Sequence, residues 1–98
     1  MGKYLVLWEI DQTKIPIDPK ERAVAWGLLM GLIEQDIEKG LTKDWGAFVG
    51  ETNGYAINEG TEVEVMLGLA QYVPFCIFKV HPIATKGHVL EMIKALSG

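Results

Sequence analysis

The segment Lys3–Ile10, which reads KYLVLWEI, constrains the fold more than any other stretch of this chain. Its aromatic, aliphatic and β-branched residues favour a β-strand, and no polar alternation interrupts them before Glu9. Both faces of such a strand are apolar, with Tyr4, Val6, Trp8 and Ile10 on one face and Leu5 and Leu7 on the other. The strand therefore needs cover on both sides.

The length of the chain limits what can supply that cover. Its 98 residues make a single domain, residues 1–98, with no room for a second. A chain this short buries only about 60% of its unfolded surface, so its core needs a supplement. Cys76 is the only cysteine and cannot close an intramolecular disulfide. Because 49% of the residues are hydrophobic, we expect that supplement to be a second copy.

Charge and hydropathy exclude two classes of partner. The chain has 9 basic and 13 acidic residues, a net charge of −4, and Arg22 is its only arginine. Nucleic-acid binding needs clustered Lys and Arg, so no such partner is expected. The uncharged stretch Ala23–Ile33 is too short to span a membrane, and the apolar run Tyr4–Trp8 is too short for a signal peptide. We expect a cytoplasmic protein.

Capping signals define the first helix. Asp18 is a suitable N-cap, Pro19 suits the first helical position and Glu21 would complete a capping box. Gly40 follows as a C-cap, so the helix is predicted to end near Lys39. Its apolar stripe consists of Trp26, Met30, Ile33 and Ile37.

A hairpin and a second helix are predicted next. Two strands, 45–52 and 55–59, flank Asn53-Gly54, a pair that favours a type I′ turn. A capping box from Thr61 to Glu64 then starts a helix predicted to span residues 62–73. Its apolar stripe is Val63, Met66, Leu67, Ala70 and Val73.

The last two elements complete the order βαββαβα. Residues 75–81 are predicted to form a strand that Pro82 closes. A short terminal helix follows, with the apolar stripe Val89, Met92, Ile93 and Leu96. A βαββαβ core is the ferredoxin-like α+β arrangement, a four-stranded antiparallel sheet with both long helices on one face. The other face would be bare, and a second copy related by a two-fold axis is its simplest cover.

Three segments resemble a family of small domains of unknown function within the dimeric α+β barrel superfamily. They are KYLVLW at residues 3–8, GYAINE at 54–59 and FKVHPI at 78–83. That superfamily includes muconolactone isomerase and the cofactor-free monooxygenases of antibiotic biosynthesis. The resemblance implies two sheets facing each other as a barrel, with pockets between sheet and helices. The monooxygenase pattern, an Asn on the first strand, is not reproduced because Trp8 and Glu9 stand there, so no catalytic residue is carried over.

Several chemistries are excluded by residue type. The only serine, Ser97, lies beside the carboxyl end, which excludes a rigidly held serine nucleophile. Cys76 lies in an apolar run and is expected to be an inert core thiol. His81 and His88 lack the spacing of metal ligands, so neither a metal nor a cofactor is predicted. The GxxxG match at 27–31 lacks the P-loop lysine and is interpreted as a close-packing site.

One pair of carboxylates is the candidate for catalysis. In the ferredoxin-like strand order 4-1-3-2, the first and third strands are expected to lie side by side and parallel, so that Glu9 and Glu59 meet at their carboxyl ends, near Trp45 and Asn58. Two partly desolvated carboxylates would split their pKa values and could serve as acid and base. The alternative is that both are solvated strand ends. His81 is placed beside Tyr4, too far from Glu9 to form a dyad with it.

Two functions remain open after these steps. The first is a homodimeric small-molecule-binding protein that could act as a cofactor-free isomerase or monooxygenase-like enzyme. Its pocket would lie between the first helix and the sheet and take an apolar or aromatic ligand, lined by Trp8, Trp26, Trp45 and Asn58, with Glu9 and Glu59 as catalytic residues. The second is a non-catalytic dimeric structural or regulatory module, whose aromatic residues only fill a core. An open cavity beneath the first helix favours the first function.

Overall fold

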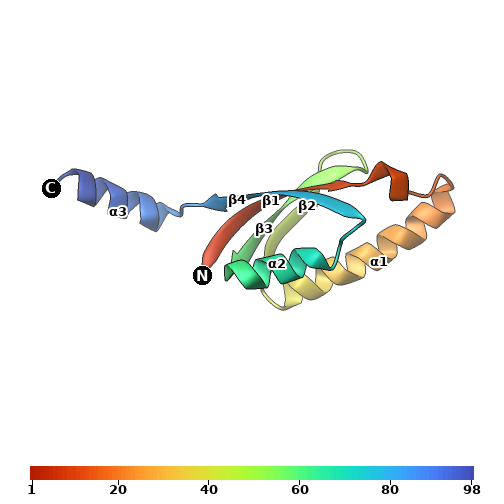
Figure 1. The fold of residues 1–98 in the computed structure, drawn as a ribbon, viewed down its shortest axis with the longest axis horizontal. Helices are drawn as coiled ribbons and strands as arrows, with labels where there is room; N and C mark the ends of the chain where they lie inside the picture. The colour runs from red at the N-terminus through yellow and green to blue at the C-terminus, as the bar shows by residue number, and fades with distance from the viewer.

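A computed structural model describes residues 1–98 and shows an α+β fold with one four-stranded antiparallel sheet. The elements follow in the order β1 (Gly2–Ile10), a 3-10 turn (Gln12–Lys14), α1 (Pro19–Glu38), β2 (Thr42–Ala47), β3 (Asn53–Gly60), α2 (Glu62–Ala70), β4 (Cys76–Ile83) and α3 (Lys86–Leu96). The strand order β2-β3-β1-β4 confirms the ferredoxin-like arrangement. Helices α1 and α2 lie on one side of the sheet, and α3 projects away from it (Figure 1).

Strand β1 lies in the centre of the sheet, as its two apolar faces predict. It pairs with β3 on one side and β4 on the other, antiparallel to both. Val6, Trp8 and Ile10 are buried beneath the helices, whereas Leu5 and Leu7 lie on the face that no helix covers. We call this uncovered side the outer face. Its apolar side chains come from three paired strands and are Leu5, Leu7, Tyr55, Ile57, Ile77 and Ile83.

The direction of β3 corrects one expectation. The strands β1 and β3 are antiparallel, with Lys3 opposite Glu59 and Glu9 opposite Asn53. The helical crossover makes β2 parallel to β1, and the hairpin then reverses β3. The carboxyl ends of β1 and β3 therefore lie at opposite ends of the sheet.

The hairpin forms, but its turn lies elsewhere than predicted. Strand β2 ends at Ala47 and β3 begins at Asn53, so residues 48–52 make the turn and Asn53-Gly54 belongs to a strand. Gly50, at φ 152°, is the turn residue in the region that favours glycine. The predicted type I′ turn at Asn53-Gly54 is wrong because Gly54 has another role, described below.

The predicted helices form with small differences at their ends. Helix α1 begins at Pro19 and is followed by Gly40 at φ 80°, as its C-cap predicts. Asp18 occupies the N-cap position without a side-chain hydrogen bond, so the Glu21 capping box is not made. The capping box of α2 is made, since Thr61 Oγ1 accepts from Glu64 N and Glu64 Oε1 accepts from Thr61 N. Helix α2 ends at Ala70 instead of Val73.

The apolar stripe of α2 faces the opposite way from the prediction. Val65 and Gly68 are buried against the body, whereas Val63, Met66 and Leu67 are between 63% and 68% exposed. The helix is apolar around most of its circumference, so periodicity could not tell which face packs inward. The GxxxG glycines of α1 are not a close-packing site within this chain, which corrects their interpretation from the sequence. Gly27 and Gly31 lie on the exposed face of α1, with no atom within 4 Å of an added Cβ.

Strand β4 runs through Pro82 to Ile83 rather than stopping before the proline. This is tolerated because β4 is an edge strand, where a missing amide donor removes no ladder bond on the open side. His81 pairs with Leu5, one residue from the expected Tyr4, and shares the outer face with Lys79.

Candidate functional site

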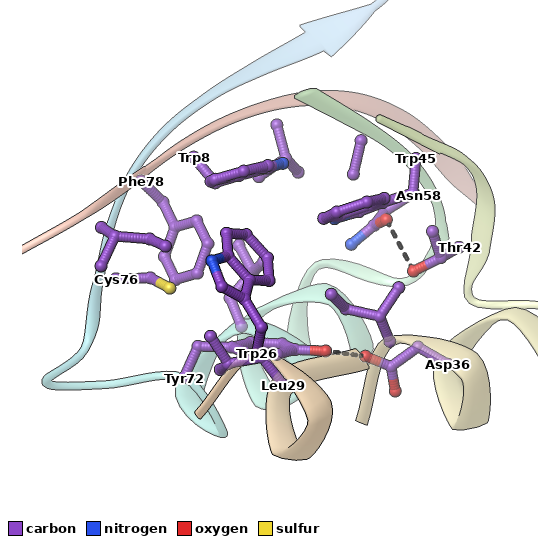
Figure 2. Close-up of a pocket in the computed structure, with 15 residues that line it drawn as sticks. Trp8, Trp26, Leu29, Asp36, Thr42, Trp45, Asn58, Tyr72, Cys76 and Phe78 are labelled. Carbon is purple, nitrogen blue, oxygen red and sulfur yellow. Dashed lines mark hydrogen bonds between the residues drawn. The ribbon is translucent and has the colours of Figure 1, made fainter. Parts of the chain in front are cut away.

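The four predicted ligand-lining residues surround one cavity between α1, α2 and the inner face of the sheet. The cavity encloses about 50 Å³, and 12 of its 15 lining residues are hydrophobic. Its walls include Trp8 from β1, Trp26 from α1, Trp45 from β2 and Asn58 from β3 (Figure 2). The sequence therefore predicted these residues to lie together, although their role as ligand contacts stays a prediction.

The three indole rings form two different contacts. Trp8 and Trp45 stack with ring centroids 5.4 Å apart and planes within 4° of each other. Trp26 stands edge-on to Trp8, at 6.0 Å and 70°. The Trp8 indole is oriented by a hydrogen bond from its Nε1 to the Tyr55 carbonyl oxygen at 3.2 Å. Figure 2 shows Trp26 rising from α1 toward the stacked pair, so aromatic surface bounds the cavity on two sides.

Gly54 makes room for the Trp8 ring. A Cβ added at Gly54 would collide with the Trp8 indole and with the carbonyl oxygen of Gly46. The Asn-Gly pair is therefore required here for close approach rather than for a turn, and Trp8 can cross β3 to reach Trp45.

A buried polar pair forms one side of the cavity. Asn58 and Thr42 are 3% and 6% exposed, and Thr42 Oγ1 donates a hydrogen bond to Asn58 Oδ1 at 3.1 Å. This bond fixes the amide so that its nitrogen, which has no protein partner, points into the cavity (Figure 2). The cavity thus offers a fixed hydrogen-bond donor among aromatic walls.

A second polar group, which the sequence analysis missed, lies on the helical side of the cavity. The carboxylate of Asp36 on α1 is buried, and it accepts hydrogen bonds from Tyr72 Oη at 2.9 Å and from Gln71 Nε2 at 3.4 Å. Burial, followed by the hydrogen bond to Asp36, raises the pKa of the Tyr72 hydroxyl above its usual value of 10.0. Tyr72 therefore stays protonated and holds Asp36 in place.

No sequence signal marked Asp36 as buried. It lies between Gln35 and Ile37 in the polar last turns of a helix, where an aspartate is ordinarily solvated. Only the packing of Tyr72, 36 residues further along the chain, encloses it.

Cys76 lines the same cavity and is half-buried. Burial raises the pKa of its thiol above the usual value of 9.0, which fits the expected inert side chain. The Phe78 ring beside it packs edge-on against Tyr72 at 6.2 Å and closes that end of the cavity.

A larger cavity adjoins the first. It encloses about 340 Å³ beneath the amino-terminal half of α1 and shares Ile10, Trp26 and Leu29 with the smaller cavity as lining residues. Its polar rim includes Arg22, whose guanidinium is held by Glu51 Oε2 at 3.0 Å and by the Ile17 carbonyl at 2.8 Å. Trp26 lies at the boundary of both spaces.

The predicted catalytic pair does not form. Glu59 lies opposite Lys3, six residues along β1 from Glu9, which separates the two carboxylates by about 20 Å at strand spacing. Both side chains are on the outer face, and neither lines the cavity. Glu59 instead pairs with Lys43 at 3.8 Å. Antiparallel pairing of β1 and β3 is the physical reason for this correction.

The side chains that could hold a metal are dispersed. No group of three His, Cys, Asp or Glu side chains is close enough to bind an ion. His88 accepts a hydrogen bond at Nδ1 from the Thr85 amide at 3.0 Å and caps α3. His81 is exposed on the outer face.

None of the helices has the length and apolar character needed to cross a membrane. The chain matches no protein-family model and no curated protein.

Proposed function

We propose that this protein binds a small, flat, largely apolar molecule that carries a hydrogen-bond-accepting oxygen. The observation that carries the proposal is the Asn58 amide, which Thr42 orients so that its nitrogen faces a cavity bounded by indole rings. A flat ligand would pack on Trp26 and Trp45, and its oxygen would accept from Asn58. Binding sites are ordinarily of this kind, apolar with a few fixed polar groups.

The size of the available space supports a ligand rather than a filled core. The larger cavity beneath α1, which adjoins the Asn58 cavity at Trp26, encloses about 340 Å³, within the usual range of small-molecule sites. A module whose aromatic residues serve only packing would have no reason to leave such a space beside Trp26. This favours binding over the structural alternative.

The polar groups support binding more than acid–base catalysis. Asp36 is the one carboxylate that lines the smaller cavity, and both of its oxygens already accept hydrogen bonds. Isomerase-like or monooxygenase-like chemistry would need Asp36 to exchange its Tyr72 partner for a ligand. We therefore restrict the proposal to binding.

We also propose that the outer face packs against a second copy, as in the dimeric α+β barrels that the sequence resembles. Support comes from the six apolar side chains of that face, flanked by charges of both signs, Lys3 and Lys79 against Glu9 and Glu59. A two-fold axis could bring such opposite charges together across an interface.

The test of binding compares two probes of the same shape. 1-Indanone and indane differ by one carbonyl oxygen, and each would be titrated into the protein while the indole N–H signals are followed by NMR. We expect 1-indanone to bind roughly threefold to tenfold more tightly, the value of one hydrogen bond. Indole signals that do not move at the solubility limit of both probes would contradict the proposal.

Variants locate the effect at the amide. Asn58→Leu should remove the preference for 1-indanone, and Thr42→Val, which frees the amide without replacing it, should reduce the preference. Glu59→Gln on the outer face is the matched control and should keep it. A preference that survives Asn58→Leu would show that the amide is not the recognition group.

A further inference from the structure

Helix α3 has no partner within its own chain. All of its residues are exposed, and it extends beyond the sheet, so the molecule measures 61 Å along its longest axis against 24 and 19 Å along the others (Figure 1). It is a defined amphipathic helix, with a complete capping box from Thr85 to His88. Its apolar stripe is Val89, Met92, Ile93 and Leu96. Helices of 11 residues are marginal in water, so α3 needs a packing surface.

Helix α2 exposes a stripe of the same spacing. Val63, Met66, Leu67 and Ala70 lie at positions i, i+3, i+4 and i+7, as do the four stripe residues of α3. These side chains are exposed because the buried face of α2 uses Val65 and Gly68. The two stripes can therefore interdigitate along their full lengths.

The charges beside the two stripes are opposite. Helix α2 carries Glu62 and Glu64 and no basic residue. Helix α3 carries Lys86 and Lys94 against one acidic residue, Glu91. In an antiparallel arrangement Lys94 would lie near Glu62, and the carboxyl end of each helix would face the amino end of the other, which also suits their dipoles.

We propose that α3 of one copy packs antiparallel on α2 of a second copy, and that the exchange is reciprocal. Only Ala84 and Thr85 connect β4 to α3, and α3 continues outward from the end of β4, whereas α2 runs back beneath the sheet (Figure 1). The chain's own α2 therefore lies on the side of β4 opposite to the direction in which α3 extends, so α3 does not reach it. A two-fold axis duplicates the contact, so each dimer gains two helix pairs.

This interface is separate from the ligand proposal. It also gives α2 a second layer of packing, and Leu69 on α2 lines the smaller cavity. One side of α2 thus lines the cavity through Leu69, and its opposite side carries the exposed stripe. Failure of ligand binding would leave the helix exchange untouched, and the converse holds as well.

Cysteine cross-linking in the full chain tests the exchange. Leu67→Cys and Ile93→Cys would be combined in a Cys76→Ala background and oxidised with diamide. The account predicts a disulfide-linked dimer on a non-reducing gel. A disulfide closed within one chain would show that α3 folds back, and no disulfide would show that α3 binds another partner or none; either result would overturn the proposal.

A matched pair controls for random collisions. Val24→Cys with Ile93→Cys joins α3 to a residue of α1 that is 68% exposed, against 66% for Leu67. This pair should give at most a small fraction of the dimer. Equal yields from the two pairs would contradict a specific contact between α3 and α2.

Charge reversal tests the antiparallel register. Lys94→Glu in the cysteine pair should slow dimer cross-linking about twofold to fivefold, the value of one exposed ion pair. Adding Glu62→Lys should restore the rate. A rate that Lys94→Glu leaves unchanged, or that the second substitution lowers further, would contradict this register.

Discussion

The two faces of the sheet use similar residues in different ways. On the inner face, Trp8 and Trp45 are oriented by stacking and by a backbone hydrogen bond, and a cavity remains between them and α1. On the outer face, Leu5, Leu7 and Ile57 lie side by side with no covering layer. The inner face is built around a space, whereas the outer face is an incomplete core. The comparison indicates that the high hydrophobic content of this small chain has two uses, a ligand cavity on one face and self-association on the other.

Substitutions at two neighbouring residues of β3 should have the largest effects that separate the two faces. Ala56 faces inward and is buried, whereas Ile57 faces outward. Ala56→Lys places an unpaired charge in the core and should abolish folding, as seen by circular dichroism. Ile57→Lys should keep the fold, because its charge lies on the face that no helix covers, and light scattering should show a smaller average mass than for the unchanged protein. A folded Ala56→Lys variant, or an Ile57→Lys variant that does not fold, would break the distinction between the faces.

Removing the central ring gives the next largest effect. Trp8→Ala leaves an empty space over Gly54 and exposes the Trp45 ring, so we expect a loss of about 3–5 kcal/mol in the free energy of unfolding. Tyr55→Ala, an aromatic truncation on the outer face, is the control, and it should lower the free energy of unfolding of the monomer by a smaller amount. Urea titrations measure both, and a loss below about 1 kcal/mol for Trp8→Ala would mean that the rings do not stabilise the fold.

These effects could be foreseen only in part from the sequence. Capping signals and apolar runs predicted the element order, because local propensity and tertiary packing agree along β1 and α1. The predicted contact between Glu9 and Glu59 was wrong. The direction of β3 depends on how the helical crossover and the hairpin combine, and the sequence of neither strand encodes it. The three tryptophans were predicted to line a pocket because nine aromatic residues in 98 suit an apolar site, although they suit a filled core equally well.

Other residues could not be placed from sequence. Asp36 is buried by Tyr72, a contact that no local pattern encodes. The exposed stripe of α2 was mistaken for its buried one, because both Val63 with Leu67 and Val65 with Leu69 follow helical periodicity. Gly54 carried a turn signal, but the size of Trp8 decided its role.

The buried polar pair gives a smaller effect on stability. Asp36→Ala leaves the Tyr72 hydroxyl without its acceptor, and we expect a loss of about 1–3 kcal/mol. Combining it with Tyr72→Phe should cost less than the sum of the two single changes, because the double variant leaves neither group unpaired. Additive losses in a double-mutant cycle would show that the two side chains are not coupled.

The smallest effect is on pH dependence. Because the pKa of Tyr72 is higher in the folded protein than its usual value of 10.0, its contribution to stability is complete below about pH 10. Above that pH the unfolded chain releases the proton and the folded protein keeps it, so stability falls as pH rises. Tyr72→Phe should make the free energy of unfolding fall less steeply above pH 10. An unchanged slope would contradict burial of this hydroxyl.

The central claim, that the inner face is the ligand site, has one direct measurement. Intermolecular NOEs between 1-indanone and ¹³C-labelled full-length protein report which side chains contact the probe. The account predicts NOEs to the rings of Trp26 and Trp45 and to the methyl groups of Leu29 and Ile33, which line the cavity. NOEs to Leu5 and Leu7 on the outer face, or to Leu96 on α3, with none to the indole rings would contradict it.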